Sequence, residues 1–209
     1  MPTLLFRLEG PLQAWGLVPT LEERYTALFP TKSGVVGLLA AALGLPREAD
    51  ISRLARLPLG IRVDREGTLL VDFQLAREVI SADGSALRSR VSRRHYLADA
   101  AFLAGVEGER ERLEELQEAL RNPARILYLG RKSCLPSPPI YLPDGLLDLS
   151  LREALTAYPL FYPREEPIRL ILETQPPRGF PVPDQPVGTL AERRFTLRHV
   201  EEVLWSPST

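Results

Sequence analysis

The chain of 209 residues has few of the residue types that build disulfides and metal centres. It contains one cysteine, Cys134, and two histidines, His95 and His199. A disulfide within the chain needs two cysteines, and a structural zinc site needs about four cysteine or histidine ligands. The sequence therefore excludes the disulfide and offers no zinc cluster, and we expect neither a metal nor a cofactor.

Features of exported and membrane-spanning proteins are also missing. The apolar run at residues 35–43 is too short to cross a bilayer, which takes about 20 residues. The first ten residues alternate as a strand does and carry Arg7 and Glu9, unlike a signal peptide. The composition, 44% apolar and 25% charged, is that of a soluble globular protein. We expect a cytoplasmic protein with no membrane partner.

Lysine is nearly absent from the chain. Lys32 and Lys132 stand against 24 arginines, and a serine follows each lysine. An ammonium group is more compact and mobile than the planar guanidinium group of arginine. Two interpretations stay open: the two lysines contact phosphate, or they are exposed side chains without a ligand.

The stretch of residues 29–44 predicts a buried helix. Thr31 or Ser33 can cap its start, Gly44 ends it, and the apolar residues between them leave no polar face. At residues 32–34, free N–H groups, the positive end of the helix dipole and a lysine come together, which suits an anion such as phosphate. A nucleotide-binding P-loop is excluded because no glycine lies at residues 26–31. The alternative is a capped core helix with an exposed lysine.

The order of the predicted elements indicates an α+β protein with a ferredoxin-like (RRM-like) βαββαβ core. Residues 1–134 form this domain, and the proline-rich residues 135–209 form a small β-rich C-terminal extension. Residues 60–64 and 68–75 are expected to pair as a hairpin through a tight Glu-Gly turn. Strands are predicted at 3–8, 60–64, 68–75, 94–104 and 125–129, and helices within 29–44 and at 109–120.

Residues 77–93 lack core periodicity and are rich in arginine. Long segments of this kind inside a compact domain are usually functional, so we expect a basic arm, a mobile loop or hairpin inserted in the middle of the core. The net charge of −1 then hides one basic face. Arg94 and Tyr96 share one face of the next predicted strand, and basic and aromatic side chains on a sheet face suit single-stranded RNA.

Two other segments are candidates for RNA contact. Trp15, next to Gly16, either stacks on a base or covers the end of the core. Residues 130–134 form a second basic turn directly after the last predicted strand of the core, and the two lysine-serine pairs could lie near one rim. The residues predicted to bind RNA are Trp15, Thr31, Lys32, Ser33, Gly34, Arg77, Arg88, Arg90, Arg93, Arg94, Tyr96, Arg131 and Lys132.

Four blocks of sequence resemble the CasD subunits of type I-E CRISPR Cascade complexes, a family within the RAMP superfamily. The blocks are residues 8–16 (LEGPLQAWG), 30–38 (PTKSGVVGL), 94–102 (RHYLADAAF) and 129–134 (LGRKSC). The resemblance implies a ferredoxin-like core, with a β-hairpin thumb at the basic arm and a reduced C-terminal part. RAMP proteins often carry a glycine-rich loop, of which only Gly130 is present here.

The resemblance also implies a function and partners. Such subunits cap one end of the complex, grip the 5′ handle of the guide RNA (crRNA), and meet target DNA through the complex. Their implied neighbours are the CasC backbone subunit and the large CasA subunit. In this subtype a separate subunit, CasE, processes the precursor.

Three functions stay open. The first is a non-catalytic RNA-binding assembly subunit. The second is a metal-independent endoribonuclease that processes precursor crRNA, with His95, Tyr96 and Lys132 as candidate catalytic groups. The third is a module that only binds proteins. Strand alternation places His95 and Tyr96 on opposite faces, which argues against a shared site. We therefore expect a protein that is not an enzyme.

Overall fold

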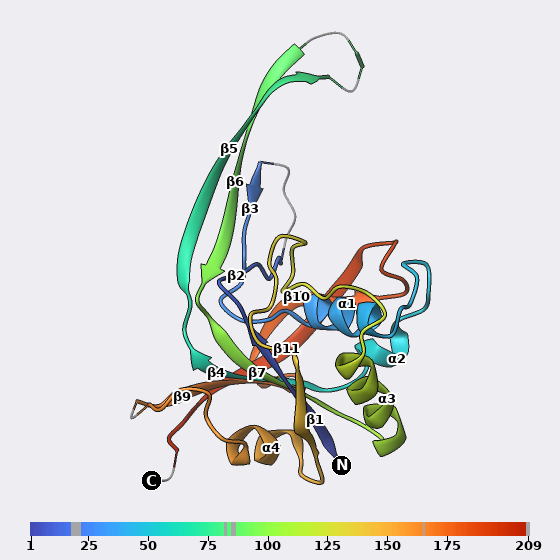
Figure 1. The fold of residues 1–209 in the computed structure, drawn as a ribbon, viewed down its shortest axis with the longest axis vertical. Helices are drawn as coiled ribbons and strands as arrows, with labels where there is room; N and C mark the ends of the chain where they lie inside the picture. The colour runs from blue at the N-terminus through green and yellow to red at the C-terminus, as the bar shows by residue number, and fades with distance from the viewer. Residues whose placement is uncertain (18–21, 82, 85–86, 165, 208–209) are drawn as a thin grey trace.

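The computed structural model describes residues 1–17, 22–81, 83–84, 87–164 and 166–207. It is a mixed α+β protein whose strands pair mostly in antiparallel fashion. Figure 1 shows a body made of a sheet and helices, from which one long hairpin projects.

The body is built on a seven-stranded antiparallel sheet. Its strands, in chain order, are β1 (Thr3–Glu9), β4 (Leu59–Arg65), β7 (Ala101–Glu107), β8 (Tyr141–Leu147), β9 (Ile168–Thr174), β10 (Phe180–Val187) and β11 (Arg194–Trp205). In space the order is β10-β11-β9-β4-β7-β1-β8. Strands from both ends of the chain therefore meet in one sheet.

Helices cover both faces of the centre of this sheet, so its central strands are apolar on both sides. In β1, Leu4 and Phe6 belong to the larger core, whereas Leu5 points into a smaller core on the opposite face. The smaller core is closed by a helix that approaches the sheet closely at Gly60, where a Cβ atom would lie 2.7 Å from Leu155 Cδ1. The larger core packs α1 (Lys32–Ala42), α2 (Ser52–Ala55) and α3 (Arg110–Arg121), and the smaller core packs α4 (Leu151–Ala157).

The projecting hairpin belongs to a second sheet. In it β5 (Thr68–Ile80) pairs with β6 (Leu87–Ala98), and the short strands β2 (Leu12–Gln13) and β3 (Glu23–Arg24) lie beside β6 (Figure 1). The ladder shifts register between Ala76 and Val79, where Glu78 has a φ of 54°. The basic arm predicted at residues 77–93 is thus the outer part of a longer hairpin.

The predicted pairing of residues 60–64 with 68–75 is wrong. β4 pairs with β7 and β9 in the main sheet, whereas β5 pairs with β6. A turn signal at Glu66-Gly67 marks a change of direction, but it does not decide which strands pair. Burial decides this, because β4 is almost wholly buried while β5 is mostly exposed. The single strand predicted at 94–104 is also two strands, separated at Asp99, which has a φ of 57°.

The predicted last strand of the core, residues 125–129, is not a strand. Its Leu129 bonds instead to the backbone of Ala14 and Cys134 in a loop. The place beside β1 is taken by β8, which belongs to the residues expected to form the C-terminal β-rich extension. Together β8 to β11 complete the same sheet as β1, β4 and β7.

Candidate nucleic-acid interface

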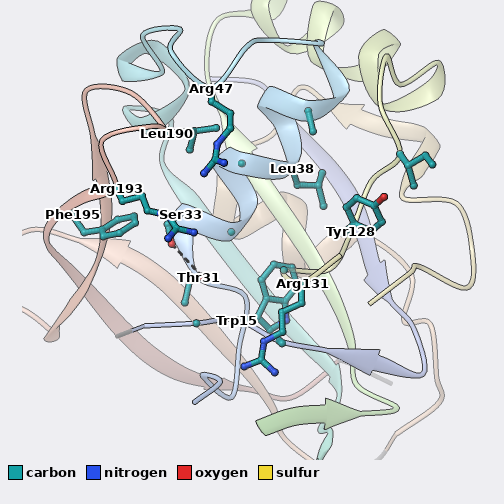
Figure 2. Close-up of a pocket in the computed structure, with 17 residues that line it drawn as sticks. Trp15, Thr31, Ser33, Leu38, Arg47, Tyr128, Arg131, Leu190, Arg193 and Phe195 are labelled. Atoms are coloured by element: carbon teal, nitrogen blue, oxygen red, sulfur yellow. Dashed lines mark hydrogen bonds between the residues drawn. The ribbon is translucent and has the colours of Figure 1, made fainter. Parts of the chain in front are cut away.

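A groove of about 450 Å³ opens at the start of α1. The loop after β2, the segment of residues 126–131 and the turn between β10 and β11 form its other walls. Figure 2 shows Arg193 and Phe195 on one side of the start of α1 and Tyr128 on the other. The groove is lined by Ala14, Trp15, Gly16, Thr31, Ser33, Gly34, Gly37, Leu38, Ala41, Arg47, Ile126, Tyr128, Gly130, Arg131, Leu190, Arg193 and Phe195.

The groove thus brings together five of the residues predicted to bind RNA, Trp15, Thr31, Ser33, Gly34 and Arg131. It adds three that sequence reasoning missed, namely Arg47, Arg193 and Phe195. No local signal marks these residues, because their role depends on the turn between β10 and β11 folding back against α1.

The start of α1 is capped differently from the prediction. Thr31 occupies the N-cap position, but its side chain makes no capping hydrogen bond. The backbone N–H of Lys32 donates instead to Asp184 Oδ2 of β10, at 2.8 Å. Ser33 and Gly34 complete the first turn, whose N–H groups have no partner within a helix. Both residues line the groove, so their N–H groups are potential donors to an anion there.

Neither interpretation of Lys32, phosphate contact or an exposed side chain without a ligand, is supported by this structure. The side chain of Lys32 is only 2% exposed. Its Nζ donates to Glu173 Oε2 at 2.6 Å and to the carbonyl oxygen of Leu57 at 2.8 Å. Burial lowers the pKa of this ammonium group, and the nearby Glu173 carboxylate opposes that change. Lys32 is therefore an internal cation that ties α1 to β9.

The carboxylate that caps α1 is itself held by an arginine. Arg198 of β11 donates to both oxygens of Asp184, at 2.9 and 2.7 Å, and its Nη1 lies 4.0 Å from Glu173. Two cations, Lys32 and Arg198, thus balance two carboxylates, Asp184 and Glu173. This network fixes the start of α1 against three strands of the C-terminal half.

Trp15 covers the core and does not offer a free face to a base. It is 0% exposed, and its Nε1 donates to Gln13 Oε1 at 3.0 Å. A Cβ atom on Gly34 would lie 2.7 Å from its Cε3 atom, so the start of α1 rests directly on the indole ring. Of the two interpretations of this residue, the structure supports the covering of the core. Thr31 is likewise buried, at 1% exposure.

Arg131 joins the groove to the hairpin. Its guanidinium carbon lies 4.7 Å from the centre of the Tyr96 ring, and its Nη2 donates to the carbonyl oxygen of Arg24 at 2.6 Å. Within the described residues, its buried Nη1 and the Nε of Arg94 have no hydrogen-bond partner. A buried donor without a hydrogen-bond partner costs free energy of folding. An anion beside Arg131 or Arg94 would accept a hydrogen bond from the unpaired donor.

The arginines of the hairpin divide between its two faces. Because strand residues alternate, Arg88, Arg90 and Arg94 lie on the same face of β6 as Tyr96, and we call this the arginine face. Arg93 lies on the opposite face and pairs with Glu23 Oε1 at 2.7 Å. Arg90 is 3.8 Å from Glu22, but both side chains are largely exposed, so this pair contributes little. Arg77 and Lys132 are exposed.

The candidate catalytic groups do not converge. His95 Nε2 lies 3.2 Å from Glu23 Oε2, and its ring centre is 4.8 Å from that of Tyr25. Tyr96 lies on the other face of β6, beneath Arg131. The structure therefore gives no support to a site shared by His95 and Tyr96.

The described ranges contain no group of three or more histidine, cysteine, aspartate or glutamate residues placed to hold a metal ion. None of their helices is long and apolar enough to span a membrane.

Residues 3–201 match the model of a family described as CRISPR-associated protein (Cas_Cas5), and the chain belongs to this family. A relative is the CRISPR system Cascade subunit CasD of Escherichia coli (strain K12). It is 36% identical over 157 residues, which cover 66% of this chain and 69% of CasD.

Two solved structures share the fold over nearly the whole chain. One, described as "Crystal structure of Cas protein", is 49% identical, with a TM-score of 0.83 over 98% of this chain and 95% of the other. The second, "CRISPR RNA-guided surveillance complex", is 33% identical, with a TM-score of 0.85 over 98% of this chain and 90% of the other.

Proposed function

We propose that this chain is a non-catalytic subunit of a type I-E CRISPR surveillance complex. It grips the 5′ handle of the guide RNA and caps the backbone of the assembly in the cytoplasm. The observation that carries the proposal is the groove, where the first turn of α1 meets Arg47, Arg131 and Arg193. N–H groups at a helix start and arginine guanidinium groups both bind phosphate oxygens.

The groove and the arginine face offer one continuous path for an RNA strand. Arg131 lines the groove and also lies over Tyr96, which shares the arginine face with Arg94. Farther along the same face come Arg90 and Arg88. A strand that leaves the groove past Arg131 would therefore meet three more guanidinium groups in succession. Contacts of this kind position RNA without reading its sequence.

We also infer that the core is the ferredoxin-like unit. The elements β1, α1, β4, β7, α3 and β8 follow one another in the βαββαβ order. Their strands lie side by side in the order β4-β7-β1-β8, all antiparallel. On this assignment the hairpin of β5 and β6 is an insertion between the second and third strands, and β9 to β11 extend the sheet.

The proposed partners follow from the proposed role as a subunit of the surveillance complex. The chain binds crRNA directly, contacts a CasC backbone subunit and the large CasA subunit, and reaches target DNA through the complex. The relatives named as a Cascade subunit and as a surveillance complex support a role inside a multi-subunit assembly.

The double variant Arg131→Ala/Arg193→Ala tests the groove. We expect weaker binding of labelled guide RNA by the purified full-length chain, to a similar extent for unrelated sequences, because phosphate contacts carry no base information. The slope of log affinity against log salt should fall by about 0.7 for each lost contact, hence by about 1.4. Fluorescence anisotropy at several salt concentrations measures both quantities.

Arg152→Ala is the matched control for this experiment. Arg152 is an exposed arginine of α4, on the opposite face of the main sheet from α1. The control should bind RNA as the wild type does. An unchanged salt slope in the folded double variant would show that RNA does not use the groove.

We further expect no ribonuclease activity. Incubating the purified chain with precursor crRNA should give no cleavage products, because His95 and Tyr96 lie on opposite faces of β6. Denaturing gel electrophoresis with and without a chelator checks this. Cleavage that persists with the chelator and disappears in His95→Ala would establish the endoribonuclease instead.

A further inference from the structure

The carboxylate that caps α1 lies at the end of the helix that also borders the groove. Asp184 Oδ2 accepts a hydrogen bond from the Lys32 N–H at 2.8 Å. The next two residues of the helix, Ser33 and Gly34, line the groove (Figure 2). Asp184 is 1% exposed, so salt and water screen its charge poorly. An uncompensated carboxylate in this position would repel a phosphate group that accepts from the Ser33 or Gly34 N–H.

Arg198 supplies the compensating charge. Its Nε and Nη2 donate to the two oxygens of Asp184, at 2.9 and 2.7 Å. In this bidentate geometry a guanidinium group holds a carboxylate most strongly. Arg198 is itself buried and is not among the described residues that line the groove. It is therefore placed to act on an anion through Asp184, without touching the anion.

The two charges belong to a set of four that act on one another. Lys32 Nζ lies 2.6 Å from Glu173, and Arg198 Nη1 lies 4.0 Å from the same carboxylate. Burial lowers the pKa of the Lys32 ammonium group, and Glu173 opposes this change. Arg198 lowers the same pKa and Asp184 raises it, in smaller measure. Two cations and two carboxylates leave the set neutral, so the loss of any one charge alters the potential at the start of α1.

We propose that Asp184 and Arg198 are positioning residues for an anion site at the start of α1, where Asp184 fixes the first turn and Arg198 cancels the charge that would repel phosphate. The inference rests on the proposed function and deepens it, because it gives β10 and β11 a part in setting the affinity of the groove. A second observation points to an anion here. The buried Nη1 of Arg131, which lines the same groove, has no hydrogen-bond partner within the described residues.

Two single substitutions should change the affinity for an anion in opposite directions. Asp184→Asn keeps an oxygen for the Lys32 N–H but removes a negative charge, so it should strengthen binding about fivefold. Arg198→Met leaves the Asp184 carboxylate uncompensated, so it should weaken binding about fivefold. A role confined to stability predicts instead that both variants lose affinity, because each breaks the same ion pair.

Inorganic phosphate is the first probe and labelled guide RNA the second, both with the full-length chain. Phosphate binding is followed by NMR at the backbone amide resonances of Ser33 and Gly34, which report on the start of α1 itself. RNA affinity is measured by fluorescence anisotropy at several salt concentrations. The salt slope should stay at the wild-type value in Asp184→Asn and Arg198→Met, because no phosphate contact is lost.

Three further variants serve as controls, each checked for folding by circular dichroism. Arg198→Lys keeps the charge without the planar fork, so its affinity should stay within about twofold of the wild type. Asp184→Asn/Arg198→Met is neutral again and should lie between the two single variants. Asp64→Asn removes another buried, paired carboxylate, which lies against the end of α4, so the affinity should be unchanged. If Arg198→Met does not fold, the direction of the change in Asp184→Asn decides.

The wild-type chain can already overturn the proposal, if phosphate leaves the Ser33 and Gly34 resonances where they are. So does an Asp184→Asn variant that binds phosphate no more tightly than the wild type. A salt slope that falls by about 0.7 in Arg198→Met is the third contrary result, since Arg198 would then contact phosphate itself.

Failure of the proposed function gives a different pattern. Phosphate would then bind more tightly to Asp184→Asn, as expected here, while Arg131→Ala/Arg193→Ala would keep the wild-type salt slope for RNA. The groove would not be the RNA site, and the inference about the anion site would stand.

Discussion

Lys32→Ala is expected to lower the free energy of unfolding by at least about 3 kcal/mol. Removing one partner of a buried ion pair leaves the other charge uncompensated, which typically costs about 3–5 kcal/mol. Here Glu173 would keep its bond from the Leu59 N–H and the more distant Arg198, so we expect the lower end of that range. Urea denaturation followed by circular dichroism measures the loss.

Lys132→Ala is a matched control within the same chain. Lys132 is also followed by serine, but its side chain is exposed. Its removal should change the free energy of unfolding by no more than about 0.5 kcal/mol. If Lys132 contacts phosphate, the salt slope of RNA binding should fall by about 0.7.

Substitution by alanine should therefore affect different quantities at the two lysines: the free energy of unfolding at Lys32 and the salt slope of RNA binding at Lys132. Lys32→Ala should lose stability and, measured where it is still folded, keep its salt slope. A Lys32→Ala protein that is as stable as the wild type and has a reduced slope would contradict the structure. It would mean that the ammonium group leaves Glu173 to bind RNA.

Arg62→Met is expected to be the most destabilising single substitution among those considered. Arg62 and Asp64 on β4 are completely buried, and two bonds of 2.6 and 2.9 Å join them. The Arg62 guanidinium also donates to the carbonyl oxygens of Leu155, Tyr158 and Pro159, which end α4. Methionine would leave a buried carboxylate and three carbonyl groups without these donors, so a loss of about 5 kcal/mol is expected.

The double variant Arg62→Met/Asp64→Leu separates charge from hydrogen bonding. It leaves no buried charge, so it should regain part of the stability that Arg62→Met loses. It should not recover fully, because the Phe161 N–H loses its bond of 2.9 Å to Asp64. A loss below about 1 kcal/mol for Arg62→Met would mean that water replaces the guanidinium at the end of α4.

Helices were the most predictable elements, because their periodicity is local. The helices predicted within 29–44 and at 109–120 correspond to α1, Lys32–Ala42, and α3, Arg110–Arg121. The pairing of strands was not predictable in the same way. Residues 60–64 and 68–75 both have the composition of strands and flank a turn signal, yet β4 lies within the main sheet and β5 projects from it.

The residues of the candidate site likewise divide into those that the sequence indicated and those that it did not. The sequence pointed to the start of α1 and to Arg131, since glycine, serine and basic residues gather there. It could not indicate Arg47 or Arg193, which reach the groove only through tertiary contacts. It also could not show that Lys32 is buried and Lys132 is exposed, because a serine follows each lysine.

The sequence by itself determined the α+β class, the two long helices, the position of the basic arm and the lack of a disulfide. These follow from composition, periodicity and turn chemistry, which act over a few residues. Only the tertiary structure decided that Lys32 is an internal cation, since its partner Glu173 lies 141 positions away. It also decided that the hairpin projects from the body, because β5 pairs with β6 and not with β4. Burial and counter-charge depend on residues distant in the chain, so no local pattern reveals them.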